Sequence, residues 1–472
     1  MATITFYGAV SNVTGSCYLI ETQHSRLLME CGLFQGDRLT EKQNEAPFPF
    51  DVASLDAVVL SHAHLDHSGR LPKLIKEGFQ GIIYMTRATG ELLAVMLKDS
   101  ANLMARDIQW ENKRRQRSGK PALSPLYSID DVETTLSKCQ GIYYQKQQKM
   151  TDDIHVCFHD AGHILGSAIV ELLIHEDDRK SAHVSKKLIF TGDLGNSSAA
   201  LLRDPSTMTD ADIVLMESTY GDRNHKPLQE TLSEFNYILE DAAISGGNVI
   251  IPAFAVGRTQ ELLFRLGERY QDNNLKQQAV FLDSPMAIAT TEIYHRFQDI
   301  FNDEDTLSLR EAHASSLHRW LPVLQYSRTP EESMALNRLT GGAIIIAGSG
   351  MCTGGRVRHH LKHNLWRRDA HVIIVGYQAQ GTLGRRLVDG AKVVHLFGEE
   401  IKVNATIHTL GGFSAHAGQT QLLQWASRFH KPRPPLYLVH GEPNSKSSLL
   451  KELHHQLQWQ GTIAQDRQKI TF

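Results

Sequence analysis

Three histidines and an aspartate stand close together in one short segment of the sequence, His62-Ala-His-Leu-Asp-His67. The apolar run just before it, Asp56-Ala-Val-Val-Leu60, predicts a short buried strand. A loop at the end of a strand can direct several side chains toward one point, and neutral imidazole and carboxylate are good ligands for Zn²⁺. Packing alone does not require so many polar groups there, which argues against a set of surface histidines. The candidate ligands are His62, His64, Asp66 and His67.

Further candidate ligands lie at the ends of other predicted strands. His163 stands in AGHILGSA, Asp193 in TGDLG and His440 in YLVHGE. Each adjoins an apolar run and a glycine, and glycine permits the backbone to approach an ion or ligand closely. A lone histidine is more often structural, but the segment 62–67 favours a role in metal binding for these three residues as well.

The first part of the chain reads as short strands separated by turns. A long helix is predicted from Thr89 to Arg117, ending in the basic run Lys113-Arg-Arg-Gln-Arg117. A solvated helix end is the simpler interpretation of this run, and a phosphate contact is the alternative. The other predicted elements are strands over Ile4–Tyr7, Cys17–Ile20, Arg26–Glu30, Ala57–Leu60, Ile154–His159, Ala168–Ile174 and Lys187–Phe190.

From about residue 213 strands and helices alternate, which predicts βαβ units and a parallel sheet. From about residue 392 the chain returns to strands and turns, and it closes with a strand over Leu436–Val439 and a helix from about Ser445. The alternating region contains strands over Ile213–Met216, Asn248–Ile251, Val280–Leu282, Ala343–Ala347 and His371–Val375, and helices over Pro227–Ile244, Gly257–Tyr270, from Pro285, and Gly355–Leu365.

The composition is that of an ordinary globular protein with two or three domains. The 472 residues are 41% hydrophobic and 21% charged, and the net charge of −3 excludes an overall attraction for nucleic acid. The five cysteines include no CxxC pair, so neither a disulfide framework nor a zinc knuckle is indicated. The start of the chain does not resemble a signal peptide, and no apolar run approaches the ~18 residues that span a membrane. We therefore expect a cytoplasmic protein without membrane association.

The motifs in combination resemble those of a known family. HxHxDH followed by a histidine, a TGD aspartate and a final histidine is similar to the metallo-β-lactamase superfamily. The stretches Glu217-Ser-Thr-Tyr-Gly221, Phe413-Ser-Ala-His416 and His440-Gly-Glu442 resemble its β-CASP branch of nucleic-acid nucleases. Within that branch, the chain resembles prokaryotic relatives of the pre-mRNA 3′-end-processing endonuclease. The resemblance extends over essentially the whole chain.

The resemblance implies an α/β protein, in which a metallo-β-lactamase αββα sandwich carries an inserted β-CASP domain with a parallel sheet. The implied boundaries are 1–212 for the first part of the sandwich, 213–400 for the β-CASP domain and 401–472 for the completion of the sandwich. The family usually has aspartate where this chain has Glu30. That residue supports the ligands, so the longer side chain leaves the orientation of the histidine loop open. The implied cofactors are two zinc ions, one held by His62, His64 and His163, the other by Asp66, His67 and His440, with Asp193 bridging both.

The implied chemistry is phosphodiester hydrolysis, which two zinc ions about 3.5–4 Å apart can support. The leaving oxygen then needs a proton, and the resemblance assigns its delivery to His416, oriented by Glu217, with Asp193 on both metals. A carboxylate beside an imidazole keeps the ring protonated, as a general acid requires. Members of the family that act on RNA tend to have histidine at the position of His440, which points to single-stranded RNA as the substrate.

Glycine-rich turns after two predicted strands could bind RNA phosphates. Ala347–Gly355 and Gly376–Arg386 expose backbone N–H groups and lead into helices, whose N-termini favour anions. Neither turn has the lysine of an ATP-binding P-loop, so ATP binding is excluded. The candidate RNA-binding residues, with a further strand-to-helix turn included, are Ser349, Gly350, Arg356, Arg385 and Arg258.

Three alternatives compete with a ribonuclease. A small-molecule metallohydrolase acting on thioesters or lactams would leave the inserted domain, Glu217 and His416 without a role. A diiron redox protein would have glutamate in place of His64. An RNA-binding scaffold without activity is disfavoured because all seven ligand positions are occupied. We expect endonucleolytic cleavage; a share of exonuclease activity and a homodimer remain open.

Overall fold

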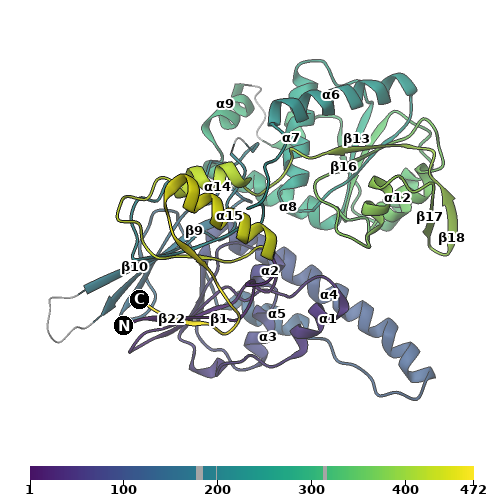
Figure 1. The fold of residues 1–472 in the computed structure, drawn as a ribbon. Coiled ribbons are helices and arrows are strands. Elements are labelled where there is room, and N and C mark those ends of the chain that lie inside the picture. Colours follow the sequence, from purple (N-terminus) through teal and green to yellow (C-terminus); the bar gives the residue numbers. More distant parts are fainter. Residues whose placement is uncertain (177–183, 198, 312–315) are drawn as a thin grey trace. The chain divides into compact units, whose positions relative to one another are not determined.

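The computed structural model describes residues 1–176, 184–197, 199–311 and 316–472. Two compact units make up the described chain, and the chain leaves the first unit to form the second and then returns (Figure 1). The first unit comprises 1–197, 204–224 and 416–472, and the second comprises 198–203 and 225–415.

The first sheet of the first unit has the order β22-β1-β2-β3-β4-β5-β6. β1 pairs antiparallel with β2 and β22, whereas β3, β4, β5 and β6 run parallel. The strands are β1 Thr3–Phe6, β2 Tyr18–Glu21, β3 Arg26–Met29, β4 Ala57–Val59, β5 Ile82–Thr86, β6 Cys139–Ile142 and β22 Lys469–Thr471.

A second sheet packs face to face on the first, in the order β21-β20-β11-β10-β9-β8-β7. The core between them contains Phe6 and Tyr18 from the first sheet and Phe158 and Phe190 from the second. β7 to β10 are antiparallel, and β10, β11, β20 and β21 are parallel. The strands are β7 Gln148–Lys149, β8 Ile154–Asp160, β9 Ala168–Glu176, β10 Val184–Phe190, β11 Ile213–Met216, β20 Leu436–Leu438 and β21 Gly461–Ile463.

Helices cover the outer faces of both sheets (Figure 1). Leu422 and Trp425 of α14 and Leu449 and Leu453 of α15 pack on the second sheet. α4 contacts β5 and β6 of the first sheet, and α5 contacts α3 and α4. This arrangement confirms the predicted αββα sandwich. The helices of this unit are α1 Arg38–Lys42, α2 Leu65–Ser68, α3 Leu71–Lys76, α4 Arg87–Arg117, α5 Ile129–Ser137, α14 Gln419–Ala426 and α15 Pro443–Leu457.

The second unit is built on a parallel sheet in the order β14-β13-β15-β12-β16-β19, as the alternating pattern predicted. A hairpin of β17 and β18 packs beside it through Val394 and Leu396. The strands are β12 Val249–Pro252, β13 Ala279–Asp283, β14 Leu324–Tyr326, β15 Ala343–Ala347, β16 His371–Val375, β17 Val393–Leu396, β18 Glu399–Lys402 and β19 Thr406–Leu410. The helices are α6 Leu228–Ser245, α7 Arg258–Gln271, α8 Pro285–Arg296, α9 Asp303–Glu311, α10 Leu317–Trp320, α11 Pro330–Leu336, α12 Val357–Asn364 and α13 Leu383–Val388.

The division between the units lies near residues 224 and 415 rather than near 213 and 400. β11 belongs to the first unit because it pairs with β10 and β20, and β19 belongs to the second because it pairs with β16. Among the described helices, none combines the length and apolar character that crossing a membrane requires.

Candidate metal centre and active site

The loop after β4 presents the first group of candidate ligands. β4 is buried and runs parallel between β3 and β5, so its carboxyl end opens at one edge of the sheet. His62 and His64 follow there, and Asp66 and His67 lie on the short helix α2. Gly32 permits the close approach of the β3 end to α2, since a Cβ at Gly32 would lie 1.6 Å from the Asp66 carbonyl oxygen.

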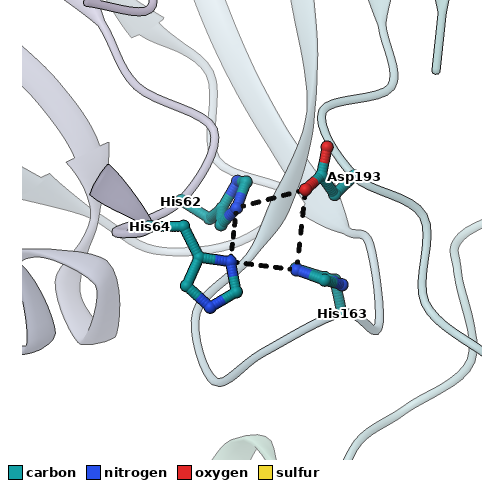
Figure 2. Close-up of side chains that lie close together, drawn as sticks. All are labelled: His62, His64, His163 and Asp193. Carbon is teal, nitrogen blue, oxygen red and sulfur yellow. Dashed lines mark hydrogen bonds and ion pairs between the residues drawn. The ribbon is translucent and has the colours of Figure 1, made fainter. Parts of the chain in front are cut away.

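One cluster contains His62, His64, His163 and Asp193 (Figure 2). The Nδ1 atom of His64 lies 3.1 Å from Nε2 of both His62 and His163. Asp193 Oδ2 lies 3.5 Å from His62 Nε2 and 3.6 Å from His163 Nε2. The four donor atoms therefore surround one point, although their residues come from the ends of β4, β8 and β10.

A second cluster contains Asp66, His67 and His440. The Nε2 atoms of His67 and His440 lie 3.1 Å apart, and Asp66 Oδ2 lies 3.6 Å from His440 Nε2. Asp193 reaches this cluster with its other oxygen, because Oδ1 lies 3.3 Å from both His67 Nε2 and His440 Nδ1. The carboxylate of Asp193 thus lies between the two clusters and contacts both.

The donor set fits metal ions better than internal hydrogen bonding. Ring nitrogens face ring nitrogens at 3.1 Å in each cluster, and a pair of neutral imidazoles can share only one hydrogen there. Asp193 Oδ1 is buried without a hydrogen-bond partner, and such orphaned atoms in native proteins call for an explanation. Histidine nitrogen and carboxylate oxygen are donors that zinc accepts.

The electrostatics of the two clusters also favour cations. Burial lowers the pKa of His62 well below its usual range, which leaves a neutral imidazole with a lone pair for a metal. Burial alone would raise the pKa of Asp193, but His440 and His67 hold it well below its ordinary value. For a histidine, burial has the opposite effect and would lower the pKa of His67. The neighbouring carboxylates, first Asp193 and then Asp66, raise it well above its ordinary value. The site therefore attracts positive charge, and a bound metal would displace such protons.

Glu30 supports the histidine loop directly. Its backbone has φ of 64°, a left-handed conformation that glutamate seldom adopts. Its carboxylate accepts hydrogen bonds from Ser61 N at 2.6 Å and from Ser61 Oγ at 2.9 Å, and it contacts Nδ1 of His67. The longer side chain in place of the family's aspartate therefore still reaches both the loop and a candidate ligand.

His440 is held by residues to which the sequence analysis assigned no role. Its Nδ1 lies 3.1 Å from Thr219 Oγ1, and its backbone N–H donates to the carbonyl of Ala9 at 2.6 Å. Ser218 Oγ donates to the carbonyl of Val439, the residue that precedes His440 in the chain. These contacts join segments more than 200 residues apart, so no local pattern in the sequence announces them.

His416 and Glu217 form a pair beside the clusters. His416 Nδ1 lies 3.4 Å from Glu217 Oε1 and 4.0 Å from Asp193 Oδ2, and its ring packs 4.4 Å from that of His163. Glu217 is fully buried and accepts from the backbone N–H groups of Leu194 and Thr219. Burial would lower the pKa of His416, but the contact with Glu217 raises it above its ordinary value.

Comparison with known proteins finds three family models that match parts of this chain. A model of the metallo-β-lactamase superfamily matches residues 11–136, a β-CASP domain model matches 259–387, and a model of a Zn-dependent metallo-hydrolase RNA specificity domain matches 400–464. A Thermus thermophilus protein named Ribonuclease TTHA0252 is 39% identical over 95% of both chains. The chain belongs to the β-CASP branch of the metallo-β-lactamase superfamily.

Other relatives of this β-CASP protein have related names. A transcription termination factor FttA of Methanocaldococcus jannaschii is 31% identical over 93% of this chain and 67% of its own length. An RNase J-like protein of the same organism is 29% identical over 94% of this chain and 93% of its own. A solved structure from Enterococcus faecalis, described as a protein of unknown function, covers both chains fully with a TM-score of 0.54 at 12% identity and shares the fold.

In the β-CASP unit, the glycine-rich turns lie at the carboxyl edge of the parallel sheet. Ser349 and Gly350 follow β15, and the Ser349 hydroxyl accepts from the backbone N–H of Gly354 at 3.3 Å. Gly350 is buried against Phe254, whose ring a Cβ at Gly350 would approach to 2.9 Å. The turn after β15 is thus closely packed, with Ser349 partly exposed.

The three arginines predicted to contact RNA in the β-CASP unit have partners within the protein. The guanidinium of Arg356 donates to Asp283 at 2.7 Å and to two backbone carbonyls, which anchors the turn. Arg258 is buried and ion-paired with Glu261. The side chain of Arg385 is 42% exposed and pairs with Asp389, the residue that follows α13. Of the three, Arg385 has the side chain most open to a ligand.

Proposed function

We propose that this protein is a zinc-dependent ribonuclease that hydrolyses phosphodiester bonds of single-stranded RNA. The observation that carries the proposal is the pair of ligand clusters joined by Asp193, with His416 4.0 Å from the same carboxylate. Membership of the β-CASP branch, a relative named as a ribonuclease and the match to an RNA specificity domain support RNA as the substrate.

Two zinc ions suit the donor set. His62, His64 and His163 would hold one ion, and Asp66, His67 and His440 the other, with Asp193 bound to both. Bound there, zinc would make a water molecule more acidic and offset the negative charge that develops on the phosphate. Glu30 orients His67 through Nδ1, which leaves Nε2 directed at the cluster.

The protein itself supplies the proton that the leaving oxygen needs. His416 faces Glu217 with Nδ1, so Nε2 is the ring atom that would pass a proton to the leaving oxygen of the RNA. Glu217 keeps its own place through two backbone N–H groups, and it stabilises the protonated ring. His416 therefore acts as the general acid, and Glu217 positions it.

The second unit would hold the RNA backbone. Ser349 and the backbone of Gly350 follow a strand of the parallel sheet, and Arg385 adds a half-exposed positive charge to the next such turn. The ion pairs of Arg258 with Glu261 and of Arg356 with Asp283 hold the turns in which these arginines lie. We propose endonucleolytic cleavage, in the cytoplasm, where the cysteines stay as the free thiols that the described chain contains.

Zinc content and cleavage of an end-labelled single-stranded RNA test the proposal. We expect two zinc ions per chain, and we expect His67→Ala to lose more than about 100-fold in cleavage rate, beyond the loss typical of a residue that only supports a ligand. RNA binding should persist, and His24→Ala, an exposed histidine, should cut normally.

Other outcomes would overturn the assignment. His67→Ala that cuts RNA at the normal rate would contradict the metal site. A zinc-loaded protein that hydrolyses a thioester and leaves RNA intact would replace the proposal with a small-molecule hydrolase. RNA binding without cleavage by the zinc-loaded protein would indicate a scaffold. The ladder of labelled products separates endonuclease from exonuclease activity.

A further inference from the structure

The second half of α4 and the loop that follows form an arm, residues 102–125, that extends beyond the sandwich core (Figure 1). The buried residues of α4 end at Ala101, yet the helix continues to Arg117, about 24 Å further at 1.5 Å per residue. Burial of an apolar stripe normally stabilises a surface helix. Because the arm buries none of its helical residues, its length calls for another explanation.

The returning loop is fastened to the helix. The side-chain amide of Asn112 donates to the carbonyl of Leu123 at 2.9 Å and accepts from its N–H at 2.7 Å. Arg115 Nε donates to the carbonyl of Pro121 at 2.6 Å. The two bonds of Asn112 resemble those between the backbones of paired strands, and together with the bond of Arg115 they hold the loop in one conformation. The arm therefore presents a formed surface and not a loose loop.

One face of the arm combines an aromatic ring with positive charge. Leu103, Arg106, Trp110, Arg114 and Arg117 recur at helical spacing. Trp110 is 64% exposed, and the guanidinium of Arg114 lies 5.2 Å from the centre of its ring while also pairing with Glu111. An exposed tryptophan beside a planar cation offers two flat surfaces for stacking.

The arm also differs in charge from the rest of the chain. Residues 102–125 contain six basic and two acidic side chains, a net charge of +4, whereas the whole chain has −3. The arm is therefore a local region of positive charge, which favours a polyanion as its ligand.

We propose that the face of Trp110, together with Lys113 and Arg117, is a second binding surface for single-stranded RNA, separate from the site of cleavage. A protein partner would need a complementary acidic surface, whereas the phosphates of RNA supply negative charge along the whole strand. Bases stack on aromatic rings and guanidinium planes without regard to sequence, and phosphates pair with the cations. The proposal rests on RNA being the substrate, and it makes the arm the part that captures long RNA.

Affinity for RNA measured apart from cleavage tests the arm. Zinc-loaded protein with His416→Ala as background is titrated into a fluorescent single-stranded RNA of about 30 nucleotides, longer than one site of about 4–16 nucleotides. Trp110→Ala should weaken binding at least about fivefold. Lys113→Ala with Arg117→Ala should reduce the slope of log K against log salt by about 1.4, or about 0.7 for each phosphate that is no longer neutralised.

Matched controls are exposed residues elsewhere in the chain. Trp366→Ala, at 56% exposure, and Lys146→Ala with Lys451→Ala should leave affinity and salt slope unchanged. In the active protein, an RNA of about six nucleotides should be cut at the normal rate by the arm variants, because it is too short to reach a second site.

The outcomes separate the arm from the cleavage site. Unchanged affinity and salt slope in both arm variants would overturn the proposal, even if RNA is cut normally. Loss of self-association in Trp110→Ala with unchanged RNA binding would overturn it in favour of an interface between copies of the chain. RNA that binds through the arm but is not cut would contradict the proposed function and leave the arm supported.

Discussion

At the scale of single residues, Asp193 determines how the candidate centre is organised. One carboxylate lies within 3.6 Å of four imidazoles, with Oδ2 toward His62 and His163 and Oδ1 toward His67 and His440. Asparagine in its place would keep the shape but lose the charge and one acceptor. The two clusters would then be separate histidine groups with no anion between them.

His416 carries the prediction that belongs to this scale. Replacing it with alanine should lower kcat about 10²- to 10⁴-fold, as expected when a general acid is removed. KM and zinc content should stay close to normal, because the imidazole contacts Glu217 and Asp193 and is not among the seven residues proposed to hold the two zinc ions. Steady-state kinetics on a defined single-stranded RNA, together with metal analysis, measure both. A change in KM alone would make His416 an RNA-binding residue.

At the scale of elements, the pairing of β8 with β9 contains a titratable contact close to the loop of His163. His159 Nε2 lies 3.3 Å from Glu171 Oε2 across the two strands. Contacts with Cys157 and Glu171 raise the pKa of His159 to about 9. A histidine whose pKa is raised on folding stabilises the fold fully below its unfolded pKa of about 6.5, and the contribution disappears as pH rises through about 9.

His159→Gln should therefore destabilise the protein at pH 6 by about 1–2 kcal/mol and have little effect at pH 10. Urea unfolding of the variant and of the unaltered protein at both pH values gives the difference between their free energies of unfolding. Titration of the candidate ligands affects both proteins alike, so it cancels in this difference. The exposed His24→Gln is the control and should cost nothing at either pH. An equal loss at pH 6 and pH 10 would show that packing, not charge, explains the effect.

The elements that the sequence predicted well are those whose signals are local. The helix predicted over Thr89–Arg117 is α4 Arg87–Arg117, and the strands of the parallel sheet appear where apolar runs stand between turns. The return to strands predicted from about residue 392 is confirmed by β17 and β18. β6 and β7 were not predicted, because short strands with exposed residues such as Gln140 have no apolar pattern. Their partners in the sheet determine their conformation.

The residues of the candidate site also divide into those with a local signal in the sequence and those without one. His62, His64 and His67 could be recognised because four polar donors in six residues are exceptional, and the others because each follows a strand. Thr219, which lies against His440, could not, because that contact joins residues 221 positions apart. The role of Arg356 could not be predicted either, since its ion pair with Asp283 joins residues 73 positions apart in the sequence.

At the scale of the whole molecule, the candidate ligands tie distant parts of the chain together within the first unit. His62 follows β4 in one sheet, and Asp193 and His440 follow β10 and β20 in the other. The insertion of most of the second unit separates residues 224 and 416 in sequence. A metal held by such ligands cross-links segments that are adjacent only when the unit is folded, so binding energy becomes folding energy.

Removal of the metal should therefore loosen the first unit selectively. At free zinc 100 times its Kd, each bound ion adds about 2.7 kcal/mol to stability, so a chelator should raise the population of opened states about 100-fold for each ion that it removes. Hydrogen exchange should accelerate at the backbone amides of β4, β10 and β20, while those of β12, β15 and β16 in the second unit keep their protection. The same chelator should change less in His67→Ala, which keeps the full set of ligands for only one of the two ions. Unchanged exchange in the first unit of the unaltered protein would contradict a structural contribution of the metal, because ions bound by ligands from both sheets must oppose the separation of those sheets.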